Sequence, residues 1–280
     1  MFSFFEEFMA DPRGVLIVFL LALPGRLLAL SAHEAAHAWM ADRCGDPTAR
    51  YMGRVTLNPL KHIDPLGFIM MIVVGLGWAK PVPVNPINFR NYRKDDLKVS
   101  IAGVTMNFIL FIIGCIAMYV FAVAALAQLP VAANLYASKA EMFRTVADGE
   151  AVFVSGRYYY VIRELMHYGT GLSEVLIAPV FGQTAGYIYE MLAGFVGTNL
   201  MLAAFNLIPL PPLDGYHVLN DLVLKRPLFA DQRAAAVGNA LLYLGLFSGV
   251  LNDVLSWIYS NVLMGTGNIV MWILSAVNFL

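Results

Sequence analysis

Two histidines and a glutamate form the clearest chemical pattern in the sequence. Residues 33–37 read HEAAH, which matches the HExxH pattern of zinc proteases. Because residues four apart share one face of a helix, His33 and His37 can both reach a single metal ion. Glu34 lies beside them and can take a proton from a water molecule at that metal. The pattern therefore predicts a hydrolytic zinc site with Glu34 as its general base.

A catalytic zinc site needs a third protein ligand as well as an open coordination position. His62 is one candidate and lies in a polar stretch between two prolines. Asp214 is another and follows a proline-rich run that ends a long apolar segment. A carboxylate at such a broken helix can face a buried metal, although Asp214 can also cap the helix that begins there. The residues by themselves leave both candidates open.

The competing interpretation of residues 33–37 is a pair of histidines at a membrane interface, with Glu34 in a salt bridge. That interpretation has to explain why three ionisable groups gather in an apolar run, where burying such groups is costly. We therefore favour the zinc site.

The composition predicts that membrane-spanning helices position these groups. Of the 280 residues, 59% are hydrophobic and 13% are charged, whereas about a quarter of the residues in an ordinary globular domain are charged. The apolar residues fall in continuous runs rather than alternating with polar ones, which favours helices over a barrel. The net charge of -1 and the lack of a basic stripe argue against nucleic-acid binding.

We expect an all-α polytopic membrane protein with about six transmembrane helices, formed by 1–280 as a single membrane-embedded domain. In the polar stretch 41–98, a short apolar island is followed by a proline-rich run. This combination predicts a re-entrant or β-hairpin-like membrane-associated segment near the active site. The predicted segments are, in order, 1–40 as the first span with the HExxH pattern, 41–98 as a cytoplasmic loop, 99–129 as a span, 130–189 as an extracytoplasmic or interfacial insertion, 190–233 as a span followed by Asp214, and 234–280 as C-terminal spans.

The distribution of lysine and arginine predicts the orientation. Nine of these residues lie from Arg43 to Lys98, and only four lie in 130–189. Cytoplasmic loops carry the excess of positive charge, so 41–98 is predicted to be cytoplasmic and 130–189 to lie outside. We therefore expect a multi-pass protein of the cell membrane whose active site opens toward the cytoplasm.

Several stretches of the sequence, in this order, resemble the site-2 protease family of membrane-embedded zinc metalloproteases from bacteria and archaea. The matching stretches are 33–38, 53–67, 77–85, Ala102-Gly103 with Asn107, and 205–215. The sequence departs from the family at Val104, where proline is usual. It also has no room for the PDZ domain that many members carry, and 130–189 matches no family element.

The resemblance implies that His33, His37 and Asp214 bind one Zn²⁺ per chain and that Glu34 is the base. It also implies that Asn107 and Asn206 lie near the active site, where an amide can support a developing oxyanion. From the residues alone, each asparagine would be interpreted as an interhelical hydrogen bond.

The implied activity is hydrolysis of a peptide bond in or near a transmembrane segment of a membrane protein. The expected partners are therefore a transmembrane protein or peptide substrate and the lipid bilayer, without nucleic acid; the sequence does not predict an oligomeric state. Gly77, Trp78 and Pro81 are candidates for binding the unwound substrate along a strand-like edge. The alternative is a metal or solute transporter that uses the same buried groups, although no pair of repeated broken helices is present.

Overall fold

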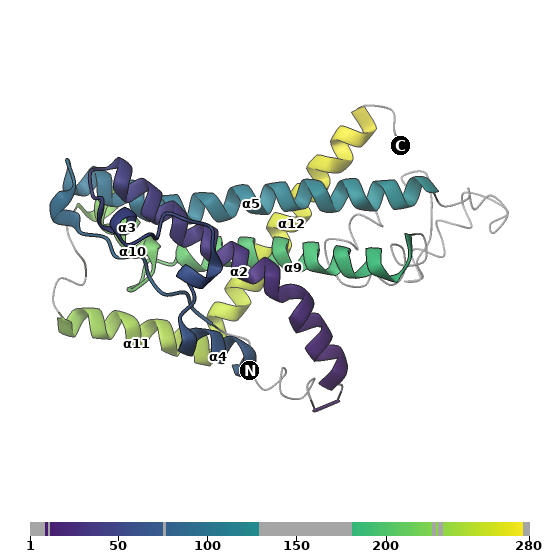
Figure 1. Cartoon of the computed structure of the whole chain (residues 1–280), viewed down its shortest axis with the longest axis horizontal. Helices are drawn as coiled ribbons and strands as arrows, with labels where there is room; N and C mark the ends of the chain where they lie inside the picture. Colours follow the sequence, from purple (N-terminus) through teal and green to yellow (C-terminus); the bar gives the residue numbers. More distant parts are fainter. Residues whose placement is uncertain are drawn as a thin grey trace. The chain divides into compact units, whose positions relative to one another are not determined.

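The computed structural model describes residues 9–10, 12–74, 77–128, 181–225, 228 and 232–276 (Figure 1). These residues form helices and contain no β-strand; the only β-type pairing among them is an isolated antiparallel bridge between Ile63 and Ala79. The prediction of an all-α fold is confirmed for this part of the chain. Most of the predicted insertion 130–189 lies outside the described residues.

The chain divides into two compact units. The first contains Met1–Ile112 and Phe195–Ser256, and the second contains Ile113–Gly194 and Trp257–Leu280. All the candidate site residues belong to the first unit. The division of 1–280 given above, as one membrane-embedded domain with six segments, stays a prediction.

Three helices are long and apolar enough to cross a membrane: α2 (Pro12–Arg43), α5 (Tyr92–Gln128) and α9 (Gln183–Asn206). A fourth span is possible if α11 (Gln232–Ser248) and α12 (Val250–Ala276), which are bent by 73° at their break, count as one. The prediction of about six spans is therefore not confirmed in the described residues.

The helix α2 carries the HExxH pattern near its C-terminal end. Pro24 lies inside this helix, where a proline removes one backbone hydrogen bond and favours a bend, and Figure 1 shows that α2 changes direction along its length. The helix nevertheless continues, so the apolar run is not interrupted at Pro24. The residues after the bend keep regular helical spacing, which places His33 and His37 on one face.

The helix α5 begins at Tyr92, earlier than the span predicted to start at residue 99. Its start is capped reciprocally: the Asn91 side chain accepts from the Lys94 N–H at 3.3 Å, and the Asp95 carboxylate accepts from the Asn91 N–H at 2.8 Å. These bonds satisfy backbone donors that have no partner within the helix. The extra turns of α5 are polar, which is why hydropathy alone missed them.

The segment between α2 and α5 contains α3 (Thr48–Tyr51), η1 (Pro59–Lys61), α4 (Pro65–Val74) and η2 (Pro86–Asn88). At 10 residues, α4 is too short to cross a bilayer. The chain that follows α4 packs closely against the start of α4. A Cβ added to Gly67 would lie 2.3 Å from the Trp78 carbonyl oxygen. Beside the Ile63–Ala79 bridge, the Lys80 N–H donates to the His62 carbonyl at 2.7 Å. Whether this turn enters a membrane stays a prediction.

The chain leaves α9 through a proline-rich loop and enters α10 (Asp214–Val218), which continues as the π-helix η5 (Leu219–Leu224). Prolines cannot continue the α9 hydrogen-bond ladder, so the helix ends at Asn206. A Cβ added to Gly215 would lie 2.3 Å from the Leu207 carbonyl oxygen, so the loop folds tightly onto the start of α10. Asp214 is thereby placed as the first residue of a new helix.

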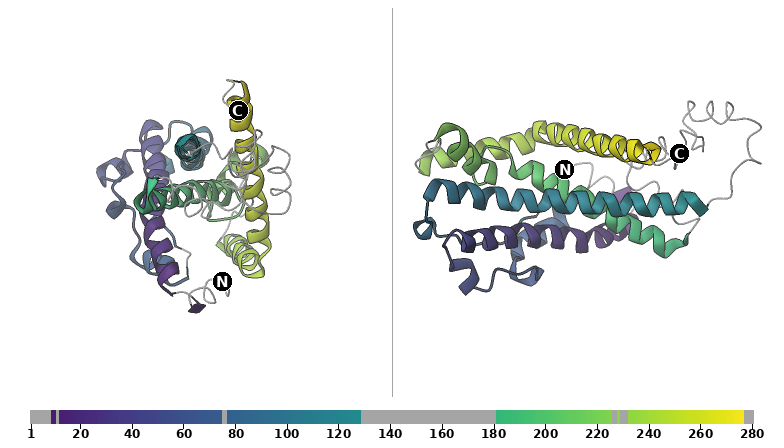
Figure 2. Two further views of the ribbon diagram at one scale, coloured as in Figure 1. Left: turned by 90° about the vertical axis from the view of Figure 1, so that its right-hand side faces the viewer. Right: turned by 90° about the horizontal axis from the view of Figure 1, so that it is seen from above.

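Within the first unit, α2 and α5 lie side by side where they carry polar residues. Figures 1 and 2 show the C-terminal half of α2 running alongside the first turns of α5. Two hydrogen bonds described below link these helices, His33 to Asn107 and His37 to Val99. This order of partners shows that the two helices run in opposite directions. The candidate site is built on this helix pair.

Candidate metal centre

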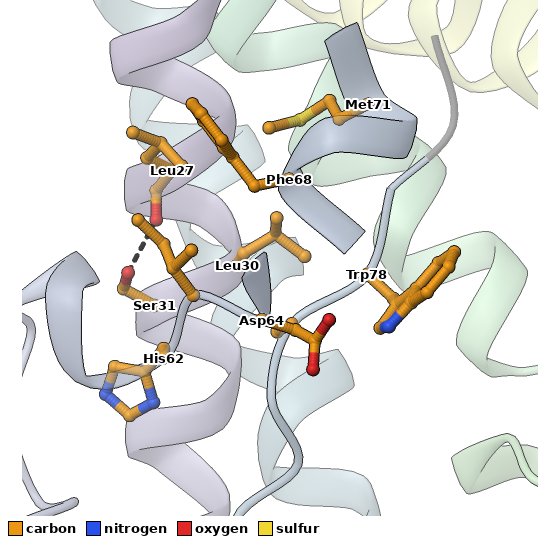
Figure 3. Close-up of a pocket in the computed structure, with 10 residues that line it drawn as sticks. Leu27, Leu30, Ser31, His62, Asp64, Phe68, Met71 and Trp78 are labelled. Atoms are coloured by element: carbon orange, nitrogen blue, oxygen red, sulfur yellow. Dashed lines mark hydrogen bonds between the residues drawn. The ribbon is translucent and has the colours of Figure 1, made fainter. Parts of the chain in front are cut away.

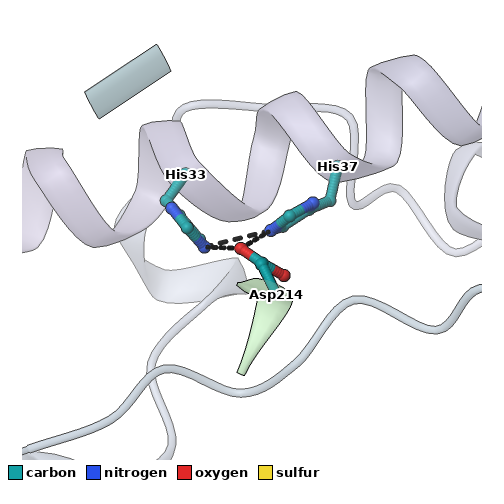
Figure 4. Close-up of side chains that lie close together, drawn as sticks. All are labelled: His33, His37 and Asp214. Atoms are coloured by element: carbon teal, nitrogen blue, oxygen red, sulfur yellow. Dashed lines mark hydrogen bonds and ion pairs between the residues drawn. The ribbon is translucent and has the colours of Figure 1, made fainter. Parts of the chain in front are cut away.

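Two histidines from α2 and an aspartate from α10 converge on one point (Figure 4). One ligand atom from each of His33, His37 and Asp214 lies within 4.8 Å of the others. The two histidine Nε2 atoms are 3.0 Å apart, and each is 3.3 Å from Oδ2 of Asp214. Of the two third-ligand candidates in the sequence, the structure brings Asp214 to the histidines.

The other ring nitrogen of each histidine makes a hydrogen bond to α5. His33 Nδ1–H donates to Oδ1 of Asn107 at 3.0 Å, and His37 Nδ1–H donates to the Val99 carbonyl at 2.7 Å. Both oxygens can only accept, so the ring hydrogen lies on Nδ1 in both histidines. In the neutral form, which binds metals, each imidazole then directs the lone pair of Nε2 toward Asp214.

The convergence of these lone pairs fits a metal cation. The Oδ2 atom of Asp214 is buried and has no hydrogen-bond donor among the described residues. Two imidazole nitrogens and a carboxylate oxygen facing one another without a hydrogen would repel, whereas a divalent cation attracts all three. Such a donor set with one open position is typical of catalytic zinc, and a second hydrogen bond from each ligating imidazole is typical of metal sites.

The charge state of Asp214 agrees with this role. Burial raises the pKa of Asp214, but a proton held on Nε2 of His33 or His37, as in metal-free protein, stabilises the carboxylate and holds this pKa below its ordinary value. The group is therefore a carboxylate at neutral pH, the form that binds metals.

Gly103 of α5 allows the two imidazoles to approach the helix. A Cβ at this position would lie 2.4 Å from Nε2 of His37 and 2.6 Å from Cε1 of His33. Val99, Gly103 and Asn107 are spaced by four residues and so share one face of α5. No site role is predicted from the sequence for Gly103 or for the Val99 carbonyl; the available signal was their position four and eight residues before Asn107.

Glu34 is half-buried and makes its hydrogen bond with the returning chain. Its Oε2 accepts from the Val82 N–H at 2.8 Å. Val82 lies between Pro81 and Pro83, which have no N–H, so Val82 supplies the only backbone donor of this triplet. The carboxylate is thus held beside the histidines without being one of the three clustered ligands.

The two asparagines predicted to lie near the active site have different hydrogen-bond partners. Asn107 is fully buried and contacts His33, as described above. Asn206 is the last residue of α9, and its side-chain amide donates to the Leu202 carbonyl one turn earlier at 3.0 Å. The Asn107 bond is interhelical, as its residue type alone suggested, and its partner is a candidate ligand. An active-site role for Asn206 stays a prediction.

His62, the other candidate for the third ligand, faces a separate environment. It is 2% exposed, and its Nε2–H donates to the Thr56 carbonyl at 2.8 Å. Burial lowers the pKa of His62, and the nearby positive charge of Arg54 lowers it further. His62 is therefore neutral at pH 7 and is not one of the three clustered ligands.

A small pocket between α2 and α4 lies beside His62 (Figure 3). Its lining is mostly apolar and comprises Leu27, Leu30, Ser31, His62, Ile63, Asp64, Phe68, Met71, Trp78 and Ala79. Of the predicted substrate-binding residues, Trp78 lines this pocket and Gly77 packs against the backbone of Gly67. Pro81 lies next to Val82, whose N–H holds Glu34. Substrate binding by these three residues stays a prediction.

A family model and two known proteins are similar to this sequence. The model of peptidase family M50 matches residues 19–247. The chain is 30% identical over 252 residues to "Putative zinc metalloprotease YwhC" of Bacillus subtilis (strain 168), covering 90% of each chain. It is 33% identical over 107 residues to "Putative zinc metalloprotease Rip2" of Mycolicibacterium smegmatis (strain ATCC 700084 / mc(2)155), covering 36% of this chain and 41% of that protein. No solved structure gives a significant match.

The family match includes the HExxH pattern and Asp214, and it confirms the resemblance inferred from the motifs. The names of both relatives and the clustered donor atoms support zinc as the metal. The matches support a metalloprotease and give no support to the alternative of a transporter. The chain belongs to peptidase family M50, the family of the site-2 proteases.

Proposed function

We propose that this protein is an intramembrane zinc metalloendopeptidase that hydrolyses a peptide bond in or near a transmembrane segment of a membrane protein. The observation that carries the proposal is the convergence of the Nε2 atoms of His33 and His37 and the Asp214 carboxylate beside Glu34. The histidines lie on a helix long and apolar enough to cross a bilayer. His33, His37 and Asp214 would together hold one Zn²⁺ per chain.

The residues of the chain provide the remaining chemistry. When bound, zinc would supply Lewis acidity that polarises the scissile carbonyl and lowers the pKa of water toward ~7. The Val82 N–H holds Oε2 of Glu34, which leaves Oε1 to take a proton from the attacking water and pass it to the leaving amine nitrogen. Val99 and Asn107 keep the two imidazoles in the tautomer that ligation requires.

Side-chain amides are suited to support the oxyanion that develops on the scissile carbonyl. Nδ2 of Asn107 is buried and has no hydrogen-bond partner among the described residues. A buried amide N–H without a partner can donate to the oxyanion as it forms, which favours the transition state over the substrate. We assign Asn107 this role, with Asn206 as a second donor.

The returning chain after α4 is suited to hold an unwound substrate. A helix hides its carbonyls in its own hydrogen bonds, so the substrate must unwind before it can be cut. Gly77, Trp78 and Pro81 precede Val82 in the chain, and Trp78 lines the apolar pocket. We propose that these three residues contact an extended, apolar stretch of the substrate by main-chain pairing and side-chain burial.

The distribution of basic residues supports an active site that opens to the cytoplasm of a multi-pass protein in the cell membrane. Reporter fusions test this orientation: a fusion after Arg93 should report the cytoplasm, and one after Ser138, which lies outside the described residues, should report the opposite side. The same side for both would contradict the span between them.

The variant Glu34→Gln tests the proposed reaction. It keeps the size of the side chain and an acceptor for the Val82 N–H but removes the base. We expect one zinc per chain to remain and turnover of a transmembrane peptide to fall by ~10²–10⁴-fold. Zinc content and turnover are measured on one preparation, with Glu190→Gln, outside the metal cluster, as the matched control. Turnover close to that of the unmodified protein would overturn the mechanism, and lost zinc would make Glu34 a ligand.

A further inference from the structure

One face of α5 contacts both histidines of the metal centre. Asn107 and Val99 accept from His33 and His37, and Gly103 leaves room for both rings. Asp96 lies three residues before Val99, so it continues the same stripe toward the start of α5. The stripe therefore has a fourth member whose partner is neither histidine of the HExxH pattern.

The partner of Asp96 is His217, in the short helix that begins with Asp214. His217 Nδ1–H donates to Oδ2 of Asp96 at 2.9 Å. Asp96 is buried, with 8% of its surface exposed, and a buried carboxylate is costly unless it is paired. The contact joins α10 to the helix that supports both histidines.

Asp214 needs support of this kind because its own element provides little. The helix α10 has five residues before it continues as η5, and its N-cap residue Leu213 makes no side-chain capping bond. Asp214 Oδ2 meets the imidazoles but receives no hydrogen bond within the described part of the chain. His217 lies three residues after Asp214, almost one turn along the same helix. A fixed His217 therefore limits how far Asp214 can move.

We propose that Asp96 and His217 are positioning residues that fix α10 on α5 and thereby hold the Asp214 carboxylate at the metal. The inference deepens the proposed function, because it rests on Asp214 as a metal ligand. It assigns His217 a role other than that of an interfacial side chain. All three zinc ligands would then be oriented from one face of α5.

The charges around the pair favour an ionic contact. The hydrogen bond with Asp96 raises the pKa of His217 despite its partial burial, so the imidazolium is favoured. Asp221 is a second acidic neighbour, and burial together with Asp96 raises its pKa to about 6. The His217 side chain is 46% exposed, so solvent screens the pair and it adds little to overall stability. Its effect is on geometry, which can be measured separately from stability.

The test compares metal binding and apoprotein stability in full-length protein purified in detergent. The variants are Asp96→Ala, His217→Ala and the double variant, with Asp95→Ala as the matched control. Asp95 is the neighbouring buried carboxylate, but it pairs with Lys98 and caps α5 instead of contacting α10. Zinc affinity is measured by competition with a chelator, and the coordination geometry by the visible absorption of bound Co²⁺.

We expect each single variant to weaken zinc binding by about 3- to 10-fold and to change the Co²⁺ spectrum. The double variant should lose no more zinc affinity than the more affected single variant, because the two residues act as a unit. His217→Asn, whose amide can donate from near the position of Nδ1, should restore part of the affinity. The control should lower the apoprotein melting temperature and leave zinc affinity within about twofold.

Unchanged zinc affinity and an unchanged Co²⁺ spectrum in both single variants would overturn the proposal. The proposal would also be overturned if Asp95→Ala lost as much zinc affinity as the other variants, because the loss would then follow stability and not the contact with α10. If the unmodified protein binds no zinc, the proposed function itself fails. If it binds zinc and the variants bind equally well, only the positioning role fails.

Discussion

Two clusters of histidine and carboxylate lie near the C-terminal part of α2, and only one of them has the geometry of a metal site. In the first, His33 and His37 meet Asp214; in the second, His62 lies two residues from Asp64. The residue types are the same. The clusters differ in whether the ligand atoms that make no hydrogen bond lie close to one another.

In the second cluster the ligand atoms do not converge: Nδ1 of His62 is buried without a hydrogen-bond partner, but His62 and Asp64 belong to no group of three ligand atoms among the described residues. Nε2–H of His62 donates to the Thr56 carbonyl, and Oδ1 of Asp64 accepts from the Gly67 N–H at 2.8 Å, which caps α4. In the first cluster, the bonds to α5 engage Nδ1 and leave both Nε2 lone pairs facing Asp214. The comparison shows that a metal site is defined by the unsatisfied electron pairs that converge, more than by the residues that gather.

Removing Asp214 should have the largest effect on this comparison. Asp214→Ala leaves two nitrogen donors, so we expect zinc affinity to fall by more than the ~100-fold that loss of a supporting contact costs. Peptide cleavage should fall with it, while Asp64→Ala retains zinc. Zinc titration of both variants provides the measurement. Full zinc occupancy in Asp214→Ala would return His62 to consideration as the third ligand.

Crowding the first cluster should weaken zinc binding almost as much as removing Asp214. In Gly103→Ala the new Cβ would lie 2.4 Å from Nε2 of His37, so the imidazoles must shift, and overpacking costs about 1–3 kcal/mol of stability. We expect lower zinc affinity and a lower melting temperature. Gly265→Ala is the control, because a Cβ there meets nothing within 4 Å, and it should preserve both quantities. Unchanged zinc binding in Gly103→Ala would contradict the close approach of α5 to the histidines.

Loss of one supporting bond should have a smaller effect. Asn107→Ala removes the acceptor that fixes the tautomer of His33, so we expect zinc affinity to fall by ~10–100-fold. Asn199→Ala is a matched control, because Asn199 is equally buried but donates to the Phe195 carbonyl of its own helix. Zinc titration should separate the two variants. Equal losses in both would show that burial of an amide, and not support of His33, determines the effect.

The smallest effect is expected in the second cluster. Because the folded pKa of His62 lies below its ordinary value, the folded state binds fewer protons there than the unfolded state. Stability is therefore lost as pH falls through the ordinary pKa of ~6.5 toward the folded value. His62→Gln should bind zinc normally and should lose less melting temperature than the unmodified protein between pH 7.5 and pH 5. A loss of zinc in this variant would remove the distinction between the clusters.

Much of the site could be predicted because it depends on local geometry. His33, Glu34 and His37 lie on one helix, and the 3.6-residue repeat places the two histidines together wherever that helix packs. The ends of the neighbouring elements also follow local chemistry: Asn91 and Asp95 cap α5, and prolines end α9. The polar first turns of α5 were missed because hydropathy identifies spans and not the helices that extend beyond them.

The sequence by itself determined the apolar helices, the HExxH pair and a short set of candidates for the third ligand. The tertiary structure brings Asp214, and not His62, to the two histidines, because that placement depends on how distant elements pack and not on residue type. It also decided which face of α5 supports the centre, through the Val99 carbonyl, Gly103 and Asn107. A backbone carbonyl is the same in every residue type, and a glycine does not by itself show which group will approach it, so these roles emerge only when packing brings α2, α5 and α10 together.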